Sequence, residues 1–167
     1  KQDTTQTQAG VALVGLYSRN GQGAKAVSVA EGLVKQQPGN PQLLNVLGMA
    51  KGQAGDLPGA KAAFEQAVKL NDSFVAPKIN LARLEIASKA HDAATVRLAD
   101  VLKANEKDTE AMGEMAVLSE RRGQQAEAQR WLEKANDLAG PKEVRWGLAL
   151  TDFHLRNDRP TQALEAI

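Results

Sequence analysis

The sequence of 167 residues contains no cysteine, and this absence removes disulfides, thiolate metal ligands and cysteine nucleophiles together. Aromatic residues make up only 4% of the chain. Strands draw on aromatic and β-branched residues, whereas this chain is rich in alanine and leucine, which favour closely packed helices. The composition therefore predicts an all-α fold.

A strong net charge and a long hydrophobic run are also missing. The 21 basic and 20 acidic residues leave a formal net charge of +1, so no large field draws the protein to nucleic acid or an anionic membrane. No apolar run approaches the roughly 18 residues that span a bilayer, and the polar start KQDTTQTQ has no signal-peptide core. We expect no nucleic-acid partner and no direct membrane insertion by this sequence.

Catalytic and cofactor motifs are missing as well. The stretch GMAKGQAGDLPGAK, at residues 48–61, is glycine-rich and ends in Lys61, but it lacks the GxxxxGK[ST] spacing of a phosphate-binding loop. The two histidines, His91 and His154, have no metal-ligand companions, and no serine lies in a GxSxG or SxxK motif. These absences predict a protein that is not an enzyme and that holds no cofactor and no metal.

What the sequence does contain is a repeat of 34 residues. Small residues recur in one column at Ala26, Ala60, Ala94 and Ala128. Glycine recurs in a second column, with lysine in the third repeat, at Gly21, Gly55, Lys89 and Gly123. The repeats run over about 7–40, 41–74, 75–108, 109–142 and, in part, 144–167, where one extra residue enters the connection.

Each repeat is predicted to form two amphipathic helices, joined near the position that holds glycine in most repeats. Asn40 and Pro41 give the second repeat a helix cap followed by a first-turn proline. Gly48, Ala60 and Ala67 are small where helices about 8 to 10 Å apart would cross, so we expect them at crossing points.

The second repeat, LLNVLGMAKGQAGDLPGAKAAFEQAVKLN, resembles the tetratricopeptide repeat in its Leu-Gly, Gly-Asp, alanine and aromatic positions. The resemblance covers residues 7–167 and implies an all-α, right-handed superhelix of antiparallel helix pairs. We expect residues 1–167 to form a single array that is a monomer and a fragment of a longer chain.

A narrower likeness is to the bacterial tetratricopeptide lipoproteins associated with exosortase (PEP-CTERM) protein sorting and exopolysaccharide production. It rests on the wording from NPQLLNVLGMAKG to LARLEI, followed by RWLEKA. That likeness implies a periplasmic or outer-membrane lipoprotein whose anchoring cysteine lies upstream; without it, a cytoplasmic location is the expectation.

Tetratricopeptide proteins bind partners along a groove lined by the first helix of each repeat. The resemblance therefore implies a non-catalytic scaffold that binds a protein, a peptide or a helix in this groove. The candidate contact residues project from one side of the first helices: Asn45, Met49, Ile79, Arg83, Glu114, Val117, Arg145 and Asp152.

Of three other interpretations, the first remains open, and the other two are disfavoured because the groove lacks the basic residues they need. The repeats could recruit substrate for a larger enzyme or secretion complex, with the catalytic residues elsewhere. An RNA-binding array would need a basic groove. A clamp for acidic chaperone tails would need basic residues at matching positions, which hold Val11, Gly15, Val46, Ala76 and Asn80.

The carboxylates of the fourth repeat form a separate question. Glu110 and Glu114 lie four residues apart on one helical face, and such pairs can act as acid and base. Arg121 and Arg122 follow Glu120, and mixed faces of this kind are usually solvated. We interpret the carboxylates as solvent-facing and the arginines as solvent-facing or paired between repeats.

Overall fold

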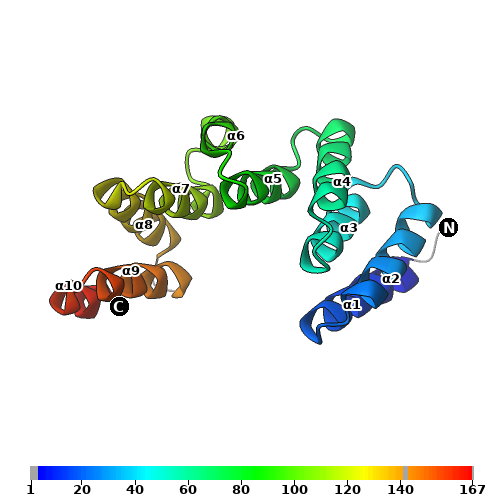
Figure 1. The fold of residues 1–167 in the computed structure, drawn as a ribbon, viewed down its shortest axis with the longest axis horizontal. Coiled ribbons are helices and arrows are strands. Elements are labelled where there is room, and N and C mark those ends of the chain that lie inside the picture. The colour runs from blue at the N-terminus through cyan, green and yellow to red at the C-terminus, as the bar shows by residue number, and fades with distance from the viewer. Residues whose placement is uncertain (1–3, 141–142, 167) are drawn as a thin grey trace. The chain divides into compact units, whose positions relative to one another are not determined.

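The computed structural model describes residues 4–140 and 143–166, so the last two residues of the fourth predicted repeat and Ile167 lie outside the described part. The described residues form ten α-helices and no strand (Figure 1), which confirms the all-α prediction. The helices are α1 (Thr4–Arg19), α2 (Gly23–Gln36), α3 (Pro41–Gln53), α4 (Leu57–Leu70), α5 (Val75–Ala87), α6 (His91–Ala104), α7 (Thr109–Arg121), α8 (Gln125–Ala139), α9 (Arg145–Arg156) and α10 (Pro160–Glu165). None of these helices is long and apolar enough to cross a membrane.

The helix boundaries follow the repeat. The second helix of each pair begins at Gly23, Leu57, His91 and Gln125, which are 34 residues apart. The last pair is displaced by one residue, because α10 begins at Pro160. The period read from the alanine and glycine columns is therefore the period of the helices.

The turn between the two helices of a pair needs a left-handed residue. Gly21, Gly55 and Gly123 adopt φ values of 69°, 85° and 74° there, and Lys89 adopts the same conformation with φ 63°. Asp158 does so in the last pair, with φ 55°. Lysine has a Cβ, so it holds this conformation at a conformational cost that glycine does not carry. The turn geometry is conserved along the chain even where the glycine is not.

Asparagine and aspartate side chains cap α3, α4 and α7, and of these caps the sequence analysis predicted the one by Asn40. The side-chain oxygen of Asn40 accepts hydrogen bonds from the backbone N–H groups of Gln42 and Leu43 at the start of α3. Asp56 caps α4 and Asp108 caps α7 in the same way. These caps satisfy backbone donors that have no partner within the helix.

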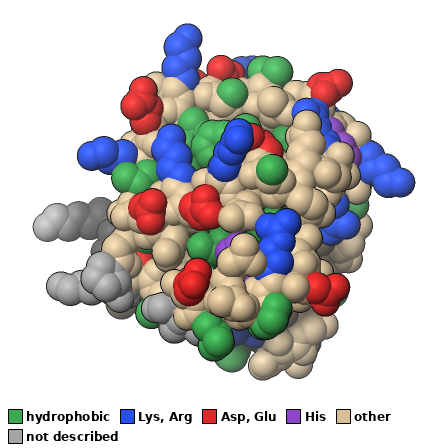
Figure 2. All heavy atoms as spheres, turned by 90° about the vertical axis from the view of Figure 1, so that its left-hand side faces the viewer, with side chains coloured by type: hydrophobic (Ala, Val, Ile, Leu, Met, Phe, Trp, Pro, Cys, Tyr) green, Lys and Arg blue, Asp and Glu red, His purple; other side chains and the backbone are tan. Residues whose placement is uncertain are grey.

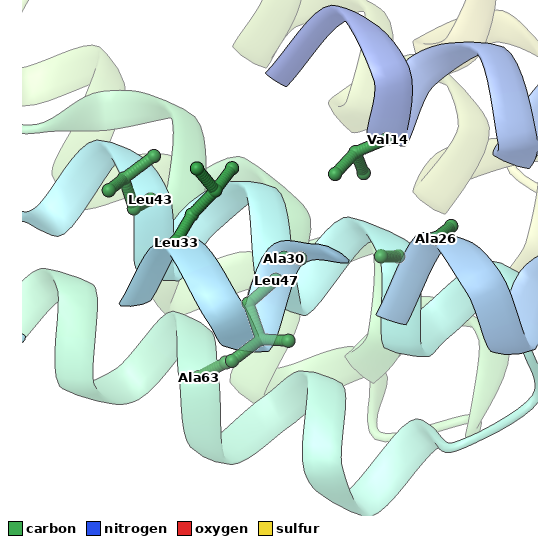
Figure 3. Packing of buried hydrophobic residues seen from close by; sticks show 8 residues of the cluster. Val14, Ala26, Ala30, Leu33, Leu43, Leu47 and Ala63 are labelled. Carbon is green, nitrogen blue, oxygen red and sulfur yellow. The ribbon is translucent and has the colours of Figure 1, made fainter. Parts of the chain in front are cut away.

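The chain divides into two compact units, Lys1–Leu84 and Glu85–Ile167, and the boundary falls within α5. The first unit contains α1 to α4 and the start of α5. Its main core lies between α1, α2, α3 and α4, where Leu47 of α3 points toward Ala63 of α4 (Figure 3). A single array over residues 1–167 stays a prediction.

A small residue lets α3 and α4 pack closely. A Cβ added to Gly48 would overlap three ring carbons of Phe64, which is itself only 3% exposed. Ala60 and Ala67 of α4 are completely buried. The prediction that Gly48, Ala60 and Ala67 lie at crowded packing positions is confirmed.

The second unit has its own core. Met112 and Ala116 of α7 pack with Leu132 of α8 and with Leu150 and Phe153 of α9. The alanine column continues through both units, since Ala26, Ala60, Ala94 and Ala128 are all 0% exposed. This column therefore lies on the buried side of the second helices.

Candidate partner-binding surface

The first helices of the first unit border a hollow, and of the eight predicted contact residues Met49 lines it. It has a volume of about 250 Å³ and lies between α1 and α3, with walls formed by Val11, Val14, Gly15, Ser18, Arg19, Val46, Met49, Ala50 and Gln53. On α1 and on α3 these residues recur at helical spacings of three and four, so each helix contributes one face. We call it the α1–α3 hollow.

A chain of polar contacts ends at Met49 on the wall of this hollow. Arg83 Nη1 donates to Asn80 Oδ1 at 3.1 Å, and Asn80 Nδ2 donates to Asn45 Oδ1 at 3.0 Å. Asn45 Nδ2 in turn donates to Met49 Sδ at 3.7 Å. Three of the predicted contact residues therefore belong to one network that joins α3 to α5.

Ion pairs join the corresponding helices of the second unit. Arg145 Nη1 of α9 lies 2.7 Å from Glu110 Oε2 of α7, and Arg156 Nη1 lies 3.0 Å from Glu120 Oε1. Asp152 accepts a second hydrogen bond from Arg156 Nε, at 2.9 Å. Burial opposes the charge of Arg156, but the carboxylates of Glu120 and Asp152 outweigh it and raise the pKa of its guanidinium.

These pairs change the interpretation of the acidic face of α7. Glu110 and Glu120 are engaged by arginines of the next pair and are not simply solvated. The expectation for Arg122 is confirmed, because its Nη2 lies 2.6 Å from Asp92 Oδ1 of α6 and pairs two repeats. The carboxylates of α7 therefore serve to tie helices together.

A tryptophan fills the space between α7 and α9. Trp146 is 7% exposed, and a Cβ added to Gly113 would overlap its ring. The guanidinium of Arg145 lies 4.2 Å from the centre of the same ring. Gly113 occupies a groove position by helical spacing, but the structure buries it beneath Trp146. Trp146 was not among the residues that the sequence analysis predicted for this face.

The structure divides the eight predicted contact residues by exposure. Met49 is 47% exposed and Val117 is 39% exposed, so both present apolar surface. Asn45 and Ile79 are buried, with 8% and 4% of their surface exposed, and contribute hydrogen bonding and packing beneath that surface. Arg83, Arg145 and Asp152 are exposed, and Glu114 is half-buried. Direct partner contact by any of them stays a prediction.

The histidines lie apart in the structure. His154 is 3% exposed and its ring meets that of Phe153 edge-on, with the centroids 5.7 Å apart, whereas His91 lies half-buried at the start of α6. Among residues 4–140 and 143–166, no group of three or more His, Asp or Glu side chains is arranged to hold a metal ion. Their roles in the described structure are those of helix packing and helix start.

Charge is distributed differently in the two units. Residues 1–84 contain nine Lys and Arg against five Asp and Glu, and residues 85–167 contain twelve against fifteen. Figure 2 shows acidic and basic side chains interspersed among separate apolar patches on one face of the molecule. The near-zero net charge of the chain therefore conceals a basic first unit and an acidic second unit.

Part of the chain matches a protein-family model. Residues 53–113, which span the second half of one helix pair, all of the next and the start of a third, match the family model described as "Tetratricopeptide repeat". Over this stretch, which is less than half of the chain, the sequence is similar to tetratricopeptide repeats. The sequence matches none of the curated proteins with which it was compared.

Several solved structures share the fold at low sequence identity. A thermophilic tetratricopeptide protein from Thermus thermophilus is 18% identical with a TM-score of 0.81, over 96% of this chain and 87% of that one. PilF from Pseudomonas aeruginosa is 14% identical with a TM-score of 0.77, over 99% and 75%. MamA from Desulfovibrio magneticus is 20% identical with a TM-score of 0.67, over 96% and 90%. The fold class is thus the α-α superhelix of the tetratricopeptide proteins.

Proposed function

We propose that the protein is a non-catalytic scaffold that binds a protein partner on the face formed by the first helices of its repeats. The observation that carries the proposal is apolar surface left exposed there. Four apolar side chains on these helices are more than a third exposed: Met49 of α3, Val117 of α7, and Leu148 and Leu155 of α9. A helix face that met only water would usually carry polar residues at these positions. Within each unit these helices pack against a folded core, so a partner segment meets a preformed surface there.

The test is capture of partners by the full-length protein, followed by binding measurements with each captured partner after purification. Met49→Glu should abolish or strongly weaken binding, because it places a charge on exposed apolar surface without disturbing the core. Leu70→Glu is the matched control, since Leu70 is 48% exposed and lies at the end of α4, outside the first helices. Equal binding by both variants would contradict the proposal.

Asn45→Ala is a weaker probe of the same surface. Asn45 is buried and accepts a hydrogen bond from Asn80, so its replacement disturbs packing as well as the surface. Arg83→Glu is also informative, because Arg83 is exposed on α5. A loss of binding by Arg83→Glu with unchanged thermal stability would support contact near the Asn80–Asn45 network.

A finer proposal is that the protein acts in exosortase-associated protein sorting or exopolysaccharide production. The sequence wording of the second and third repeats supports it, and it places the protein at the periplasmic or outer-membrane side as a lipoprotein. A full-length N-terminus without a signal peptide and a lipobox cysteine would contradict it. The alternative, a substrate-recruiting part of a larger enzyme or secretion complex, predicts a catalytic or secretion domain in the parent chain.

A further inference from the structure

We propose that the α1–α3 hollow receives an aliphatic side chain of an extended peptide whose neighbouring carboxylate pairs with Arg19. This inference rests on the proposed scaffold function and specifies the chemistry of the partner for the first unit. Four observations carry it: the size of the hollow, its lining, the state of Arg19, and the charges of the helices around it.

The size of the hollow suits one side chain. Pockets that enclose a small-molecule ligand usually measure about 300 to 1,000 Å³. The α1–α3 hollow, at about 250 Å³, is smaller than that. It is open on the face of the first helices, so a chain lying across it can insert a single large side chain.

The lining selects an aliphatic group. Val14 and Ala50 are buried, with 4% and 1% of their surface exposed, and belong to the core. Val11 and Val46 are half-buried and Met49 is exposed. A flexible methionine on the wall adapts to the shape of an inserted side chain. An aliphatic side chain gains the free energy of leaving water here, whereas a charged one would lose its hydration.

The far end of the hollow is polar and carries one cation. Ser18, Arg19 and Gln53 follow the apolar wall residues at the ends of α1 and α3. Arg19 Nη1 lies 3.7 Å from the position that a Cβ on Gly15 would occupy, so the guanidinium reaches back over the hollow. Arg19 is exposed and makes no ion pair with any residue in 4–140 or 143–166.

The other cations on the first helices of this unit are engaged. Nζ of Lys51 on α3 lies 3.2 Å from Oε1 of Glu31, and Nζ of Lys78 on α5 lies 2.8 Å from Oδ1 of Asp72. Neither α1 nor α3 contains an aspartate or glutamate. The two helices that line the hollow therefore contribute the cation of Arg19 and no carboxylate, which makes the Arg19 end complementary to an acidic side chain of a partner.

The geometry also sets the spacing of the two partner groups. The helix rises about 7.5 Å between Val14 and Arg19, at about 1.5 Å per residue. An extended peptide covers that distance in about two to three residues, at about 3.3 Å each. The partner segment should therefore carry its carboxylate two or three residues from the aliphatic side chain.

The test uses a phage-displayed library of random linear peptides, selected on the intact chain. We expect the enriched peptides to share an aliphatic residue with an acidic residue two or three positions away. In synthetic copies of the enriched peptides, replacing the aliphatic residue with alanine should raise the Kd at least about tenfold. Replacing a glutamate at the acidic position with glutamine should raise the Kd about two- to fivefold.

Two variants with matched controls locate the binding. Gly15→Leu should fill the hollow from within, because an added Cβ at Gly15 meets nothing closer than Arg19. It should abolish binding while melting no lower than the unmodified chain, since glycine in a helix is unfavourable. Gly32→Leu in α2 is the control, because a Cβ there has open space. It should leave binding unchanged.

The charge is tested by a swap. Arg19→Glu should reverse the preference, so that peptides with lysine in place of the acidic residue bind better than the originals. Lys35→Glu, an exposed position on α2, should keep the original preference. Binding that survives Gly15→Leu, or a preference that does not reverse with Arg19→Glu, overturns the inference.

These outcomes separate the two proposals. If peptides are selected but bind equally to the Gly15→Leu variant, the inference about the hollow is wrong, while partner binding elsewhere on the first helices stands. If no peptide is enriched above background and no purified partner binds, both are wrong. If the acidic preference and the block by Gly15→Leu occur together, both are supported.

Discussion

The contact between Gly48 and Phe64 gives the sharpest stability prediction. A Cβ at Gly48 would overlap Cε1 and Cδ1 of the Phe64 ring and lie 2.9 Å from its Cζ. Phe64 cannot swing into solvent without losing its packing against Ala60 and Leu81. Overpacking of this kind costs about 1 to 3 kcal/mol. The gain in helix propensity from glycine to alanine offsets about 1 kcal/mol of it.

Gly48→Ala should therefore leave stability unchanged at best and lower it by up to about 2 kcal/mol. Gly32→Ala is the matched control, because it brings the same propensity gain in α2 with nothing within 4 Å of the new Cβ. The difference between the two variants isolates the overpacking, about 1 to 3 kcal/mol. It corresponds to about 2 to 12 °C in melting temperature for a chain of this size.

Thermal and urea unfolding followed by far-ultraviolet circular dichroism measure this difference. A double-mutant cycle then assigns it to the ring. In the background of Phe64→Leu, which removes ring atoms, Gly48→Ala should become less harmful by about 1 kcal/mol or more. If Gly48→Ala is as stabilising as Gly32→Ala, or if the cycle shows no coupling, the close packing of α3 and α4 at this point is wrong.

Three further substitutions test other features. Lys89→Gly should raise the free energy of unfolding by up to about 1 kcal/mol, because it relieves the left-handed strain of lysine. Gly55→Lys at the equivalent turn should lower it by a similar amount. Chemical denaturation of both variants measures whether the two changes have opposite signs, as strain at this turn requires. Ala60→Leu should destabilise by about 1 to 3 kcal/mol because Ala60 has no exposed surface, and an unchanged melting temperature would contradict the packing. Arg97→Gln should lower the free energy of unfolding, measured by urea titration, by about 1 to 3 kcal/mol. The reason is that the Glu85 side chain is only 13% exposed and loses a bidentate partner at 2.6 to 3.1 Å. The double variant with Glu85→Gln should recover part of this loss.

The fold could be predicted from the sequence because the repeat makes each position testable several times. One alanine in a helix says little, but four alanines at a constant spacing identify a buried column, and Ala26, Ala60, Ala94 and Ala128 have no exposed surface. The same redundancy explains Lys89. Its residue type argues against a left-handed turn, yet its register predicts one, and the register is correct.

The surface was harder to predict, because helical spacing gives the direction of a side chain from its own helix and nothing about the neighbouring helix. Asn45 and Met49 lie one turn apart on α3, but Asn80 of α5 covers the first and leaves the second exposed. Gly113 points toward the same face of α7 and is covered by Trp146. To predict these outcomes, one must know the distance between neighbouring first helices. That distance depends on the size of side chains from two repeats at once.

This difference has a consequence for how partner specificity arises in the chain. The positions that repeat in this chain are those that set the packing of helices, so they carry little information about partners. The polar contacts between first helices do not repeat: α3 and α5 are joined by an Asn45–Asn80 hydrogen bond, and α7 and α9 by Glu110–Arg145 and Glu120–Arg156 ion pairs. Each contact consumes groups that a partner would otherwise meet. Arg19, which no described carboxylate engages, is therefore the cation on α1 and α3 that has charge available for a ligand.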